Sequence, residues 1–138
     1  MIALGSKLYA TWTEANGITE QVRIAVYNGD DLSPIWSFVD GNGTIGINKN
    51  ASIKAYSPQL TARSNALYAT WEESNHVRIA LYNGDDISPM WTFVDGNGTN
   101  GMNKDATKSA DSPQLTVLGS KLYATWQEAG QIRVVVAK

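Results

Sequence analysis

The sequence predicts an all-β protein that is built from one repeated unit. The run Leu-Tyr-Ala-Thr-Trp occurs three times among the 138 residues, at 8–12, 67–71 and 122–126. Runs of β-branched and aromatic residues with period-two character alternate with turn residues throughout the chain, which is typical of short strands. No stretch combines helical spacing with helix caps. A unit of this length that recurs along a chain indicates copies that stack on one another.

Each complete unit is expected to contain four antiparallel strands. In the second unit these are expected near residues 58–62, 67–71, 77–82 and 91–94. Asn83-Gly84 lies between the third and fourth strands, where its tolerance of positive φ suits a tight reversal. Four such strands form one sheet per unit.

Four-stranded sheets repeated at this length are typical of β-propeller blades. We expect residues 1–138 to be a single repeat domain with blades at about 2–40 and 57–95. A third, partial blade that stops before its fourth strand is expected at about 112–138. Apolar residues on both sides of the strands agree with this fold, because neighbouring blades cover both faces of a blade.

Three blades do not close a ring, since propellers have about four to eight. An open arc would expose two apolar blade faces to water. We therefore expect a homo-oligomer, and a head-to-tail homodimer with a closed six-bladed ring is the leading expectation. The alternatives are a fragment of a longer propeller and an assembly of more copies in another register.

The turn between the third and fourth strands resembles the Asp box, Ser/Thr-x-Asp-x-Gly-x-x-Trp, of bacterial neuraminidase repeats and sialidase-like propellers. Asp31 and Asp86 each precede a tryptophan, Trp36 or Trp91, by five residues as in the motif, whereas the hydroxyl and glycine positions differ. Residues 57–60, Ser-Pro-Gln-Leu, and the strand after them are similar to the pattern of non-catalytic members. The resemblance spans the chain and implies a non-catalytic propeller in which the box shapes a turn. The catalytic arginines, tyrosine and acid of sialidases cannot be placed here, so no catalytic residue is carried over.

Composition and charge exclude several classes of function. A net charge of −2 without a cluster of Lys or Arg argues against nucleic acid and anionic membranes as partners. The chain has no Cys and one histidine, His76, which we expect to be solvated in a turn, so neither a metal site nor a cofactor is predicted. No Ser-His-Asp set or phosphate-binding loop occurs, and the acids of Asp30-Asp31 and Asp85-Asp86 are expected to be solvated, so we expect no enzyme. No membrane span or targeting signal is present in the chain, and an extracellular or cell-surface location is the expectation.

Five tryptophans occupy repeat positions. Trp12, Trp71 and Trp126 end apolar runs and are expected in the core between blades. Trp36 and Trp91 lie beside the Asp-Asp turn, where partial exposure would let an indole face stack on a sugar ring. Burial of all five would instead favour a scaffold.

Two loops of sequence Asp-Gly-Asn-Gly-Thr follow the fourth strands. Their ligand-binding candidates are Asp40 and Asn42 in the first unit and Asp95 and Asn97 in the second. A calcium loop is the alternative, but the glycine that such a loop needs at its sixth position comes seventh here and no Glu follows at the twelfth. A plain tight turn is a further interpretation, and we predict no metal site.

Charged residues recur beside the repeat tryptophan. One glutamate follows each tryptophan by two positions, and one arginine is second in each third strand. These residues are Glu14, Glu73, Glu128, Arg23, Arg78 and Arg133. We expect one cross-strand Glu–Arg ion pair per blade, with a polar ring that grips a ligand as the alternative.

The sequence thus favours a non-catalytic propeller that binds carbohydrate through repeated sites between blades. The rival hypothesis is a structural or protein-interaction repeat of a larger surface protein with no small-molecule site. An active glycosidase is a third, weaker hypothesis.

Overall fold

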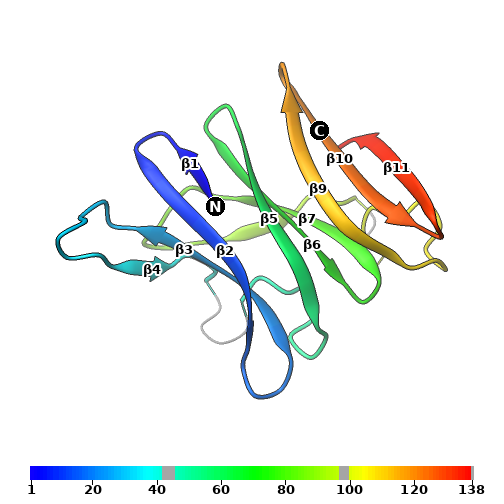
Figure 1. The fold of residues 1–138 in the computed structure, drawn as a ribbon, viewed down its shortest axis with the longest axis horizontal. Helices are drawn as coiled ribbons and strands as arrows, with labels where there is room; N and C mark the ends of the chain where they lie inside the picture. The colour runs from blue at the N-terminus through cyan, green and yellow to red at the C-terminus, as the bar shows by residue number, and fades with distance from the viewer. Residues whose placement is uncertain (42–45, 97–99, 138) are drawn as a thin grey trace.

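The computed structural model describes residues 1–41, 46–96 and 100–137. Over these residues it contains eleven strands and no helix, which confirms the all-β prediction (Figure 1). The strands form three antiparallel sheets, one after another along the chain, and no closed barrel or propeller is formed by the described residues.

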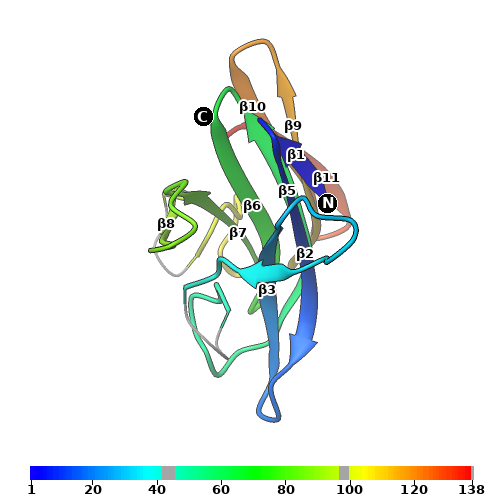
Figure 2. The ribbon, with the colours of Figure 1, turned by 90° about the vertical axis from the view of Figure 1, so that its left-hand side faces the viewer.

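Sheet 1 consists of β1 (Ile2–Leu4), β2 (Lys7–Ala15), β3 (Glu20–Tyr27) and β4 (Trp36–Phe38). Sheet 2 consists of β5 (Ala55–Arg63), β6 (Ala66–Glu73), β7 (His76–Tyr82) and β8 (Trp91–Phe93). Sheet 3 consists of β9 (Ala110–Leu118), β10 (Lys121–Glu128) and β11 (Gln131–Val136). Spatial order follows chain order in each sheet, so β5 and β8 lie at opposite edges of sheet 2 (Figure 2).

The reversal between β7 and β8 is held by side chains that cap backbone groups. The Asn83 amide N–H donates to the Met90 carbonyl at 3.0 Å and closes the hairpin. The Asp85 carboxylate accepts the backbone N–H groups of Ile87 and Ser88, both at 3.0 Å. Asn and Asp favour such local bonds over a regular ladder, which explains why the strand stops at Tyr82.

Sheet 2 buries both faces because its side chains alternate between two cores. Leu67, Ala69 and Trp71 of β6 belong to the core shared with sheet 1. Tyr68, between them, belongs to the core shared with sheet 3. In space β5 lies between β2 and β9, so the three sheets form a stack (Figure 1).

The connection from each sheet to the next folds back onto the third strand of the sheet it leaves. The side chain of Asn48 accepts the Val22 N–H at 2.9 Å and donates to the carbonyls of Glu20 (3.1 Å) and Ile53 (2.9 Å). Asn103 makes the same three contacts in the second unit, with Val77, Asn75 and Lys108. Both asparagines are buried. Their amides therefore satisfy backbone groups that the loop would otherwise leave buried and unpaired.

Candidate functional site in the groove between sheets

A buried glutamate joins each connection to the sheet that follows it. Glu73 accepts the indole N–H of Trp71 at 2.8 Å and the backbone N–H groups of Lys49 at 2.9 Å and Asn50 at 2.7 Å. The same three bonds recur in sheet 3 among Glu128, Trp126, Lys104 and Asp105. Burial raises the pKa of Glu128, but these three hydrogen bonds outweigh it and the pKa is lowered overall. Each glutamate therefore links the connection between two sheets to the sheet that follows.

The arginines pair with aspartates, so the expected Glu–Arg pairing was wrong for sheets 1 and 2. Arg23 Nε lies 2.7 Å from Asp40 Oδ2, and Arg78 Nη1 lies 3.3 Å from Asp95 Oδ2. All four side chains are buried. The reason is geometric: in β6 the residue opposite Arg78 is the tryptophan, not the glutamate, and the aspartate follows the fourth strand, which lies beside the arginine's own strand.

This pairing gives Asp40 and Asp95 a structural role, since a buried carboxylate needs a partner. The described residues hold no group of three or more His, Cys, Asp or Glu that could bind a metal ion. Asn42 and Asn97 lie outside the described residues.

A pocket of about 260 Å³ lies between sheet 1 and sheet 2 and brings two of the predicted site residues together. Its lining includes Asp40 and Gly41 from sheet 1 and Pro89, Trp91 and Phe93 from sheet 2. The two walls approach closely, because a Cβ placed on Gly41 would lie 2.6 Å from the Pro89 carbonyl oxygen. The pocket thus combines an aromatic face, a carboxylate and backbone groups.

Trp36 and Trp91 are both partly exposed, whereas Trp71 and Trp126 are buried as expected. The indole N–H of Trp91 donates to the Val39 carbonyl at 2.8 Å, and its ring stacks on Tyr82 with centroids 4.9 Å apart. Trp36, its counterpart, is 41% exposed on the outer face of sheet 1. Trp12 is only half-buried, because no preceding sheet covers that face in the described part of the chain.

The sequence analysis missed a larger pocket of about 590 Å³ beside Glu73. Its lining includes Lys49, Glu73, His76 and Arg78. The prediction of a solvated turn histidine was wrong. His76 begins β7 and is half-buried, and its Nε2 lies 3.3 Å from the Ala106 carbonyl oxygen. Its Nδ1 is buried without a hydrogen-bond partner among the described residues.

A related pocket of about 610 Å³ in sheet 3 is lined by Lys104, Trp126 and Arg133 among others. Lys49 and Lys104 occupy equivalent repeat positions in these two pockets. This recurrence, and that of Arg78 and Arg133 in the same two linings, is the signal in the sequence that could have indicated these pockets.

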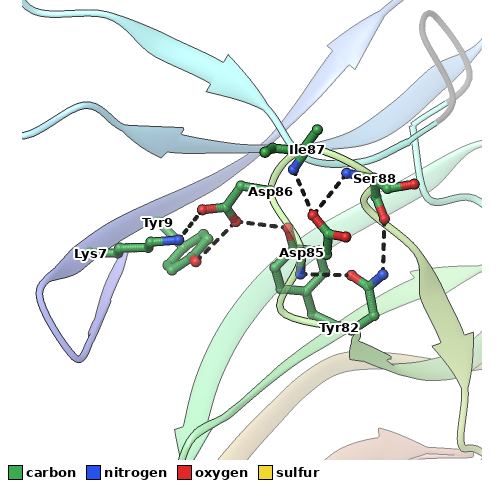
Figure 3. Close-up of polar contacts among 8 residues, drawn as sticks. Lys7, Tyr9, Tyr82, Asp85, Asp86, Ile87 and Ser88 are labelled. Carbon is green, nitrogen blue, oxygen red and sulfur yellow. Dashed lines mark hydrogen bonds and ion pairs between the residues drawn. The ribbon is translucent and has the colours of Figure 1, made fainter.

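Asp86 is the centre of a polar cluster that links sheets 1 and 2 (Figure 3). Its carboxylate forms an ion pair with Lys7 and accepts the hydroxyl groups of Tyr9 at 3.2 Å and Tyr82 at 2.8 Å. Burial raises the pKa of Asp86, but the hydrogen bonds and charge of its partners outweigh burial and lower the pKa overall. The hydrogen bond to Asp86 also raises the pKa of Lys7.

The Asp86 cluster is expected to weaken in acid. A carboxyl group whose folded pKa is lowered contributes stability above its unfolded pKa, about 3.9, and this contribution is lost as pH falls through the folded pKa. The free energy of unfolding of the native chain should therefore fall toward that of Asp86→Asn between about pH 5 and pH 2, as urea titrations would measure. A double-mutant cycle with Lys7→Met should give a coupling below about 1 kcal/mol at pH 7, because Lys7 is exposed, and none at the acid end. A gap between the native chain and Asp86→Asn that does not change with pH would contradict this assignment.

Comparisons of the chain with protein-family models, with curated proteins and with solved structures gave no match. The described residues contain no helix long and apolar enough to cross a membrane.

Proposed function

We propose that this chain is a non-catalytic carbohydrate-binding protein whose sheets are blades of a sialidase-like β-propeller. One observation carries the proposal: the pocket between sheets 1 and 2 combines the partly exposed indole of Trp91 with the backbone of Gly41, while the Asp40 carboxylate in its lining stays paired with Arg23. An aromatic face packs on the C–H face of a sugar ring, and polar groups at its edge bind hydroxyl groups.

The pocket is suited to a small, rigid contact. Tyr82 and the Val39 carbonyl fix the orientation of the Trp91 ring, so little side-chain freedom is lost when a ligand stacks on it. Its volume of about 260 Å³ lies just below the range of about 300–1,000 Å³ that is usual for drug-sized ligands. These dimensions fit one sugar ring at the end of a glycan better than an extended chain.

Repetition supports recognition of a glycan surface. Trp36 packs against Tyr27 in a tilted arrangement, with ring centroids 5.2 Å apart and an angle of 31° between the rings, and presents a second platform. Weak single sites on one body gain avidity when the ligand is itself repeated. An extracellular or cell-surface location, where such glycans occur, is part of this proposal.

The acid pair of the β7–β8 turn supports a non-catalytic role. Asp85 caps two backbone N–H groups, and Asp86 is bound by a lysine and two tyrosines. The Asp85 carboxyl group therefore stabilises the turn, and the Asp86 carboxyl group stabilises the contact between sheets 1 and 2.

A structural or protein-interaction repeat is the second candidate. Leu32 and Ile87 occupy the same position in the β3–β4 and β7–β8 turns and are 99% and 97% exposed. Exposed apolar patches mark contacts with other proteins, and the recurrence of these two side chains at one position is the observation that favours this candidate.

Replacement of both Trp36 and Trp91 by Ala should abolish binding on a glycan array while the strand signal in circular dichroism stays intact. Trp91→Ala alone should weaken binding by about tenfold, and Trp91→Phe, which keeps an aromatic face, by less. Ile87→Ser is the matched control, because it removes an exposed apolar group from the same hairpin outside the groove. If no glycan binds, or if Ile87→Ser removes binding as fully as the double variant, the chain is an interaction repeat instead.

A further inference from the structure

We propose that the chain associates head to tail with a second copy of itself, through the outer face of sheet 3 on one copy and the outer face of sheet 1 on the other. In this contact Lys121 and Tyr123 of one copy bind Asp31 of the other copy. The contact repeats one that the chain already makes between its own sheets.

The internal contact is the Asp86 cluster, in which Lys7 and Tyr9 of β2 reach across to the next sheet. Residues 5–12 and 119–126 have the same sequence, Gly-Ser-Lys-Leu-Tyr-Ala-Thr-Trp. Lys121 and Tyr123 therefore stand in β10 where Lys7 and Tyr9 stand in β2. Because the sheets stack in one direction, these two residues lie on the face of sheet 3 that points away from sheet 2.

Sheet 1 carries the other half of the cluster on its own outer face. The Tyr27 hydroxyl donates to Asp31 Oδ1 at 2.5 Å, as the Tyr82 hydroxyl donates to Asp86. Asp31 is exposed, so its carboxylate is accessible to a partner.

The middle unit has no lysine at the position of Lys7 and Lys121. Ala66 occupies the lysine position in β6, and the nearby Tyr68 hydroxyl accepts a hydrogen bond from Arg63 at 2.8 Å. That face meets sheet 3, which has no counterpart of the Asp86 turn among the described residues.

The apolar parts of both faces are uncovered as well. Val77 and Ile79 of β7, which face sheet 3, are 0% and 1% exposed. Their counterparts on the outer face of sheet 3, Ile132 and Val134, are 73% and 64% exposed. On the outer face of sheet 1, Phe38 is 51% exposed. Each half of an interface between sheets is therefore present and without a cover in the described chain.

A head-to-tail contact either closes into a ring or continues as a filament. Two copies supply six sheets, which lies within the range of about four to eight blades in which propellers close. We therefore expect a closed dimer of twice the 15.0 kDa chain mass.

Charge reversal at Lys121 and at Asp31 tests the proposed contact between the two copies. Lys121→Glu and Asp31→Lys should each weaken self-association by about tenfold or more, because each puts like charges together at both contacts of the ring. An equimolar mixture of the two variants should regain the dimer. In the mixed dimer one contact is the native Lys121–Asp31 pair and the other is the reversed pair.

Light scattering and analytical ultracentrifugation over a range of concentrations measure the mass, and circular dichroism checks that each variant is folded. Lys108→Glu, a reversal of an exposed lysine in the connection between sheets 2 and 3, is the matched control and should dimerise like the native chain. A native chain that stays at 15.0 kDa at every concentration overturns the proposal. A mixture that associates no better than either variant alone overturns it too.

Discussion

Replacement of Gly101 by Ala should lower the free energy of unfolding by about 3 kcal/mol or more. Gly101 has a φ of +60°, and a Cβ built on it would lie 2.2 Å from the Val77 carbonyl oxygen. That oxygen also accepts the N–H of Met102 at 2.9 Å, so it cannot move away without loss of the bond that docks the connection onto β7. The added methyl group therefore displaces the loop that leads from sheet 2 to sheet 3.

Gly119→Ala separates this clash from backbone strain. Gly119 has the same φ of +60°, but a Cβ there would meet nothing within 4 Å. Its substitution should cost about 1 kcal/mol, the strain of a left-handed alanine alone. Urea unfolding at one pH and one protein concentration compares the two variants, since self-association would change the apparent stability. Equal losses at the two positions would show that the loop absorbs the clash.

The strands could be predicted because their signals are local. The residues of a period-two run or of an Asn-Gly reversal lie within a few positions of one another. Because the unit is repeated, each strand pattern also occurs two or three times in the sequence. The connections could not be predicted in the same way. In the sequence Gly46 and Gly101 are only the seventh residues of the Asp40 and Asp95 loops, and no nearby residue shows that each is required by a carbonyl oxygen more than twenty residues away in the chain.

Asp40 and Trp91, two residues of the candidate site, were named from the sequence, but their arrangement in one pocket was not. The partial exposure of Trp36 and Trp91 fits the turn position of each, whereas the meeting of Trp91 with Asp40 depends on how two sheets stack. The partner of Arg23 was misassigned because its aspartate arrives from the end of the fourth strand, outside the hairpin that suggested a glutamate. Contacts between sheets leave only one trace in the sequence, the choice of residue at equivalent repeat positions.

The second large loss of stability is expected at the buried Glu73. Glu73→Gln should lower the free energy of unfolding by about 2–3 kcal/mol. The two carboxylate oxygens of Glu73 accept three N–H groups, from Trp71, Lys49 and Asn50, and the side chain is buried. Glutamine has the same shape but only one acceptor oxygen, so its own NH₂ group would face a buried N–H donor.

Glu14→Gln is the matched control, because it makes the same change of charge at the same repeat position. Glu14 is exposed and accepts the indole N–H of Trp12 at 2.9 Å, so its substitution should change the free energy of unfolding by no more than about 0.5 kcal/mol. Urea unfolding near pH 7 measures both variants against the native chain. The difference between them reports the backbone bonds that Glu73 makes to the connection between sheets, since the bond to the tryptophan is common to both. If the two variants lose the same stability, the carboxylate is not what joins one sheet to the next.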